Sequence, residues 1–123
     1  MLRPYEAVVV LDPRLEGQDG ALDGLLARLQ KVITDTGGVV RTVDRWGRRR
    51  LAYPIRHQLE GYYVLLEFDG ATGTPQELER VLRITDGVLR HLVVRQVAPA
   101  GKGAAEKAEA AQAAGEEGPQ ANG

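Results

Sequence analysis

The segment "RWGRRRLAYPI", residues 45–55, places Arg48, Arg49 and Arg50 directly before an apolar, strand-like sequence. Residues 41–57 contain six arginines and a single acidic residue. Neighbouring side chains of an extended chain point to opposite sides, so Arg49 should face away from Arg48 and Arg50. A guanidinium is planar and matches a phosphate group through two parallel hydrogen bonds. The segment therefore predicts a rigid strip that binds a phosphate-rich polyanion such as RNA, with an affinity that falls as salt rises.

Two other interpretations of this arginine segment stay open. Charge on an edge strand also discourages edge-to-edge aggregation, without any ligand. Thirteen of the sixteen basic residues in the chain are arginine, which a GC-rich genome would favour as well. The formal net charge is only −1, and residues 100–123 hold four acidic residues against two basic ones. The positive charge therefore matters through its position rather than through its total.

A second group of basic and aromatic residues comes from the two ends of the predicted domain. Arg3 and Tyr5 begin the first predicted strand, and Arg90 and Arg95 lie on the last one. If these strands are neighbours, the four side chains gather at one region of a sheet. Tyr5 and Trp46 are candidates for stacking on unpaired bases. The alternative for both aromatic residues is a half-buried position in the core.

Catalytic and metal-binding chemistry finds little support in the composition. Cysteine and serine are absent from the whole chain, which excludes disulfides, thiolate ligands and serine nucleophiles. Only His57 and His91 titrate near neutral pH without help, and two histidines are too few for a metal site. The segment "GATGTP" lacks the lysine of a phosphate-binding Walker loop. We therefore expect a protein that is not an enzyme, with no cofactor, no metal and no small-molecule substrate.

Hydrophobic periodicity predicts the elements that position these residues. The arginine-rich segment from residue 39 alternates with period two, and the extended pattern continues past Gly47 to Pro54. Proline lacks a backbone donor, so this long element should lie at an edge of the sheet. A helix over 74–84 is expected to begin with Thr74 as its N-cap. The other predicted elements are strands at 5–11, 61–68 and 88–97 and an amphipathic helix at 22–33.

The order strand, helix, strand, strand, helix, strand is that of the ferredoxin-like split βαβ arrangement, an α+β fold with a four-stranded antiparallel sheet and both helices on one face. Residues 1–97 are expected to form this one domain. Residues 98–123, rich in Ala, Gly and Glu, are expected to be a disordered tail. The face of the sheet without helices is predicted to be open and apolar, which is typical of an interaction surface.

Several of these segments resemble a known family. "RPYEAVVVLDP", "GRRRLAYPI" followed by "EGYYVLLEF", and "LRITDGVLRHLVV" are similar to the sixth protein of the bacterial small ribosomal subunit, over residues 3–97. The resemblance implies a structural constituent of the small subunit that binds small-subunit (16S) ribosomal RNA in the central domain, or platform. It implies a heterodimer with the eighteenth small-subunit protein. It also implies a cytoplasmic, ribosomal location, in keeping with a sequence that shows no secretory signal and no apolar run long enough for a membrane span.

The resemblance also indicates which residues bind RNA. The family's basic and aromatic positions correspond to Arg3, Tyr5, Arg49, Arg50, Arg90 and Arg95. With Arg48 from the arginine run, these form the predicted RNA-binding set. Leu89 stands where the family often has a second basic residue, so that contact is not carried over. The chain ends in "PQANG" rather than in glutamates, so the enzymatic addition of further glutamate known in some relatives is not expected.

Two other classes of function compete with this interpretation. The first is a free-standing binder of single-stranded nucleic acid with the same fold, although "YYVLLEF" lacks the Gly-Phe spacing that such modules carry on a central strand. Tight binding of isolated oligonucleotides without a partner would favour this class. The second is a regulatory domain that binds a small molecule, which a ligand-induced thermal shift would reveal.

Overall fold

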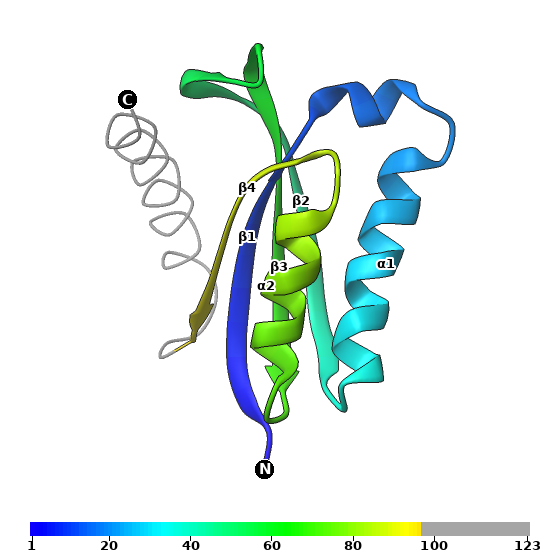
Figure 1. The fold of residues 1–123 in the computed structure, drawn as a ribbon, viewed down its shortest axis with the longest axis vertical. Helices are drawn as coiled ribbons and strands as arrows, with labels where there is room; N and C mark the ends of the chain where they lie inside the picture. The colour runs from blue at the N-terminus through cyan, green and yellow to red at the C-terminus, as the bar shows by residue number, and fades with distance from the viewer. Residues whose placement is uncertain (97–123) are drawn as a thin grey trace.

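A computed structural model describes residues 1–96 of the chain. The elements follow the predicted order, with one short 3₁₀ helix added after the first strand (Figure 1). They are β1 (Arg3–Leu11), η1 (Pro13–Gly17), α1 (Ala21–Asp35), β2 (Val39–Ile55), β3 (Gln58–Gly70), α2 (Thr74–Ile84) and β4 (Val88–Arg95). The tail predicted for residues 98–123 lies outside the described residues.

The four strands form one antiparallel sheet in the order β2-β3-β1-β4. This order confirms the ferredoxin-like α+β fold, and it places the first and last strands next to each other. Strand β2 lies at an edge, as the proline at position 54 predicted, since that residue has no N–H to give to a neighbouring strand. The arginine run is therefore carried by an edge strand.

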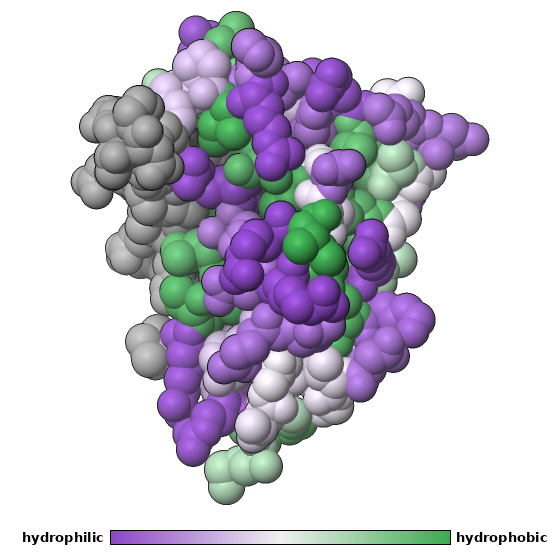
Figure 2. Space-filling model, in the orientation of Figure 1, coloured by the Kyte–Doolittle hydropathy of each residue, from purple (hydrophilic) through white to green (hydrophobic). Residues whose placement is uncertain are grey.

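Both helices pack against the same face of the sheet (Figure 1). The odd-numbered residues of β1 and the even-numbered residues of β3 point to this side, as alternation along a strand requires. They meet Leu26, Leu29 and Ile33 of α1 and Leu78 and Leu82 of α2, all of them buried. On the face viewed in Figure 2, hydrophilic side chains cover most of the surface, as expected for the outer sides of amphipathic helices.

The opposite face of the sheet, here called the open face, carries Val8, Val10, Tyr63 and Leu65. The sequence predicted that its apolar side chains would be exposed, and in the structure these four are at most 2% exposed. They form a second, smaller core that includes Leu51 from the far end of β2. The name open face is kept because no helix among residues 1–96 packs on it.

The start of α2 differs from the prediction. Gly73 is the N-cap residue, and Thr74 is already the first residue of the helix. The Thr74 hydroxyl accepts a hydrogen bond from the backbone N–H of Ala71 and one from the Thr36 hydroxyl, so it ties the preceding loop to the end of α1. Glu77, in the first turn of the helix, pairs with Arg80 over 2.6 Å.

Candidate nucleic-acid interface

The three consecutive arginines of β2 point to alternating sides of the strand, as predicted. Arg48 pairs with Tyr62 in the ladder and Arg49 pairs with Gly61, so they project to opposite faces. Arg48 reaches the helix side, where its Nε lies 2.6 Å from a carboxylate oxygen of Glu16 and its Nη1 lies 3.8 Å from Glu60. The hydrogen bond to Glu16 raises the pKa of the Arg48 guanidinium. Two acidic neighbours therefore already neutralise Arg48.

Arg49 lies on the open face together with Trp46. The guanidinium carbon of Arg49 is 5.1 Å from the centre of the Trp46 ring and 6.0 Å from that of Tyr63, which is the geometry of a cation–π contact. Residues three apart on a regular strand face opposite ways. Here a β-bulge lies between them, where Gly47 adopts a left-handed φ of +84°. The bulge shifts the alternation by one and brings Trp46 and Arg49 to the same side.

Arg90 also projects to the open face, since it is paired with Val10 on β1. Its Nη2 donates a hydrogen bond of 3.0 Å to the hydroxyl of Tyr53, which lies near the end of β2. Burial raises the pKa of the Tyr63 phenol. The positive charges of Arg49 and Arg90 lower it, but by less than burial raises it. Together, Trp46, Arg49, Tyr53, Tyr63 and Arg90 form what we call the arginine half of the open face.

The other half of the open face is acidic and polar. Glu6 and Glu67 lie opposite each other on β1 and β3, and both are buried. The Gln96 amide donates to Glu67 over 2.7 Å, and Arg41 donates to the Gln96 carbonyl over 2.7 Å. Arg41 Nε also lies 3.2 Å from Asp69. This group of five residues, the acidic half, contains one cation and three carboxylates and is unsuited to phosphate.

The remaining predicted residues do not join the arginine half. Tyr5 and Arg95 are paired across β1 and β4 and project to the helix side, with Arg3 nearby on β1. Arg90 and Arg95 are five residues apart on β4, which separates them by about 17 Å along the strand. The predicted gathering of all four residues at one place is therefore wrong. Two separate groups exist, at opposite ends of the sheet.

Tyr5 takes the half-buried position that was its alternative. Its ring stacks on Phe68 with centroids 5.6 Å apart, and its edge packs on the backbone of Gly70. Phe68 belongs to the core beneath the helices. Tyr5 is still partly exposed, next to a hollow at the start of α2 that Arg3 also lines. Any stacking by Tyr5 would use the part of the ring that Phe68 leaves uncovered.

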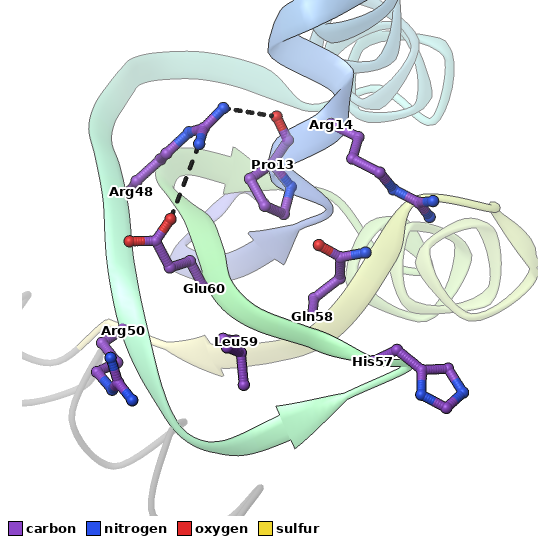
Figure 3. A pocket seen from close by; sticks show the side chains of 8 residues that line it. All are labelled: Pro13, Arg14, Arg48, Arg50, His57, Gln58, Leu59 and Glu60. Atoms are coloured by element: carbon purple, nitrogen blue, oxygen red, sulfur yellow. Dashed lines mark hydrogen bonds and ion pairs between the residues drawn. The ribbon is translucent and has the colours of Figure 1, made fainter.

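Arg50 lines a hollow of about 470 Å³ on the helix side, between the β2–β3 hairpin and η1 (Figure 3). The hollow is also lined by Pro13, Arg14, Arg48, His57, Gln58, Leu59 and Glu60. Figure 3 shows Arg48 directed toward the Pro13 carbonyl and Glu60. Arg14 is held by Asp12, and their hydrogen bonds lower the pKa of that carboxyl. Most of the positive charge around this hollow is therefore already paired.

Residues 1–96 bring no three potential metal-ligating side chains together. Over the same range, neither helix has the length and apolar character that a membrane crossing requires. His57 lies in the two-residue turn between β2 and β3, and His91 lies on β4 toward the helices.

The fold and these side chains define an α+β ferredoxin-like domain whose distinctive surface is built from arginine and aromatic residues. Residues 4–95 match the family model of Ribosomal protein S6. The chain belongs to this family of the small ribosomal subunit. Membership confirms that the protein is a structural ribosomal protein rather than an enzyme, and a ribosomal protein of this kind has a cytoplasmic location.

Named relatives agree with this assignment. The small ribosomal subunit protein bS6 of Caldanaerobacter subterraneus subsp. tengcongensis is 47% identical over 94 residues, which cover 76% of this chain and 97% of the relative. The bS6 protein of Moorella thermoacetica is 48% identical over 94 residues, covering 76% and 94%. The crystal structure of 30S ribosomal protein S6 from Thermotoga maritima has a TM-score of 0.71 at 28% identity, covering 89% of this chain and 96% of that one.

Sequence reasoning missed two features of the open face. It gave no role to Tyr53, because nothing in "LAYPI" indicates that the end of β2 leaves the ladder with β3. It also gave no role to Arg41, which contacts Asp69 and Gln96 in the acidic half. The glycine at position 47 was the available signal for the bulge, since glycine inside a strand pattern often marks one.

Proposed function

We propose that this protein binds small-subunit (16S) ribosomal RNA in the central domain of the subunit, as a heterodimer with the eighteenth small-subunit protein. The observation that carries the proposal is the arginine half of the open face. Arg49 and Arg90 project from opposite edge strands onto one face, and neither forms an ion pair with a described carboxylate. Guanidinium groups held on aromatic side chains suit both phosphate and unpaired bases.

The proposed RNA-binding residues are Arg3, Tyr5, Arg48, Arg49, Arg50, Arg90 and Arg95. The contacts of these residues in the structure rank their expected contributions to RNA binding. Arg49 and Arg90 form the first group, and Arg3, Tyr5 and Arg95 form a second group at the other end of the sheet. Arg48 contributes least, because binding phosphate would require it to give up Glu16 and Glu60.

The acidic half supports the need for a protein partner. Glu6 and Glu67 lie on the same face as Arg49 and Arg90, and their charge repels a phosphate path that crosses the whole face. A protein partner that covers this half would remove that repulsion from the RNA. The complete RNA-binding surface would then exist only in the heterodimer, and the free protein would bind RNA weakly.

A titration of a labelled central-domain RNA fragment tests the proposal. The protein alone, the eighteenth protein alone and an equimolar mixture are compared at several salt concentrations. We expect tight binding from the mixture only. With the partner present, Arg90→Ala should weaken binding and lower the slope of log affinity against log salt by about one unit.

Arg83→Ala is the matched control, because Arg83 is an exposed arginine on α2 at the helix side. It should change neither the affinity nor the slope. Tight binding by the protein alone would overturn the heterodimer and favour a free-standing nucleic-acid binder. An unchanged salt slope for Arg90→Ala would remove Arg90 from the interface.

A further inference from the structure

The hydrogen bond between Arg90 and Tyr53 joins the two edges of the sheet. Arg90 lies on β4 and Tyr53 on β2, and strands β1 and β3 lie between them. In a flat sheet two strands in between would separate these residues by roughly 14 Å, since each step between strands is about 4.8 Å. The side chains meet because the end of β2 turns over the open face. Val10 and Tyr63 lie beneath the contact.

The ladder shows where this turn begins. Arg50 pairs with Glu60 and Ile55 pairs with Gln58, so four residues of β2 stand opposite a single residue of β3. Leu51 is the first of these four, and it is buried against the open-face core. The end of β2 therefore covers the open face near Arg90, with Tyr53 as the residue that reaches β4.

The guanidinium of Arg90 has a single hydrogen-bond partner within residues 1–96. Its Nε is buried and has no hydrogen-bond partner among the described residues, whereas its Nη2 donates to Tyr53. The walls around it include Val10, Leu51 and Tyr63. A buried N–H without a partner destabilises a fold, so such a group calls for an explanation. Among the described residues, the hydrogen bond to the Tyr53 hydroxyl is therefore the contact that directs the guanidinium.

We propose that Tyr53 is a positioning residue that holds Arg90 in the orientation in which it meets the RNA. This inference rests on the proposed function, in which Arg90 contacts phosphate. Tyr53 itself needs no contact with RNA. Its hydroxyl removes the rotational freedom of the arginine before binding, so less conformational entropy is lost when the complex forms. This fixed orientation then explains why the Nε has no hydrogen-bond partner among residues 1–96.

Tyr53→Phe, Arg90→Ala and the double variant test the inference, each titrated with the RNA fragment and the eighteenth protein. Tyr53→Phe should weaken binding by about ten-fold, the usual effect of a lost hydrogen bond to a charged group. It should leave the salt slope unchanged, because the charge is still present. The double variant should bind like Arg90→Ala alone, because Tyr53 acts only through Arg90.

Tyr62→Phe is the control, since it removes a hydroxyl from the neighbouring strand on the helix side. It should bind RNA like the unmodified protein. A Tyr53→Phe variant that binds normally, while Arg90→Ala binds weakly, would overturn the positioning role and leave the proposed function intact. Normal binding by Arg90→Ala would instead overturn the RNA contact of Arg90, and the positioning role with it.

A second measurement uses the free protein and does not depend on RNA. Exchange of the Arg90 Nε proton with water, followed by side-chain NMR, should be slow in the unmodified protein because that atom is buried. In Tyr53→Phe the exchange should become faster by roughly ten-fold or more as the guanidinium moves freely. An unchanged exchange rate in a folded variant would overturn the inference.

Discussion

The two halves of the open face belong to the same sheet and differ in what their side chains can bind. The arginine half presents one guanidinium over aromatic rings and a second that donates to a tyrosine hydroxyl, and no described carboxylate pairs with either. The acidic half contains Arg41 as well, but there it is shared between Asp69 and Gln96. In the proposed RNA interface we therefore expect an arginine to contribute more where no carboxylate pairs with it.

The same distinction separates neighbouring residues on β2. Arg48 and Arg49 follow each other in the chain, yet one is held by Glu16 and the other lies over Trp46. A sequence counts both as equal contributions to a basic strip. The sheet places them on opposite faces. Carboxylates neutralise Arg48, whereas Arg49 remains available to bind a phosphate group. Substitutions under and within the arginine half test this difference between the two halves, and between the two arginines.

Gly61→Ala should have the largest effect, because it disturbs the core under the arginine half. A Cβ atom at Gly61 would lie 2.3 Å from Val10 Cγ1 and 3.2 Å from Leu51 Cδ2, and both of these side chains are buried. Overpacking of this kind lowers the free energy of unfolding by about 1–3 kcal/mol. Urea denaturation measures the change.

Gly24→Ala in α1 is the matched control for this variant. A Cβ at that position meets nothing within 4 Å. Alanine is also the better helix former, so the variant should gain about 0.5–1 kcal/mol. If Gly61→Ala were as stable as the unmodified protein, the tight packing of the end of β2 on Val10 would be refuted.

Gly47→Ala should have the next largest effect, since the bulge needs a left-handed residue. Gly47 has a φ of +84° and open space where a Cβ would be, so the penalty is purely conformational, at about 1–2 kcal/mol. Trp46 is the only tryptophan of the chain, and its emission should change as Arg49 moves away from the ring. Gly17→Ala, at a position with neither a left-handed φ nor a close neighbour, should alter neither property. Unchanged emission in Gly47→Ala would show that the bulge does not hold this pair together.

Arg49→Ala and Arg48→Ala compare two adjacent charges on opposite faces. With the partner protein present, Arg49→Ala should weaken RNA binding by roughly five-fold, the effect of a lost phosphate contact of about 1 kcal/mol. Arg48→Ala should have a clearly smaller effect, because Glu16 and Glu60 already satisfy that guanidinium. Both variants lose the same charge, so each is the control for the other. Equal losses would contradict the ranking by carboxylate neighbours.

The sequence predicted the fold well because the fold depends on local patterns. The apolar run of β1, the leucine spacing of α1 and the proline near the end of β2 each indicate an element or an edge by themselves. The alternation of Arg48 and Arg49 was predicted for the same reason. These features need only neighbouring residues and the geometry of a strand.

The site was harder to predict because it depends on contacts between distant segments. The bulge at Gly47 reverses the alternation and moves Trp46 to the face of Arg49. Arg90 meets Tyr53 only because four residues leave the ladder, and such a departure has no local signature in "LAYPI". Carboxylates such as Glu16, which lies 32 residues before Arg48 in the chain, neutralise arginines across the fold. Charge counts along a sequence cannot contain this information.

Substitution of His91 should have the smallest effect. His91 lies on the helix side of β4, and the neighbouring Arg90 on the open face influences its pKa. Burial lowers the pKa of His91 below its ordinary value of 6.5; Arg83 and Arg90 lower it further, and Glu79 acts in the opposite direction. Between pH 6.5 and that lower pKa, the unfolded chain binds more protons than the folded one. The contribution of His91 to the free energy of unfolding is therefore complete above pH 6.5 and is lost as the pH falls through its folded pKa.

His91→Gln should reduce the loss of unfolding free energy between about pH 7.5 and about pH 5. Arg90→Ala should reduce it by less, because it removes only a minor cause of the shift. A His91→Gln variant with the full acid sensitivity would show that other groups determine it.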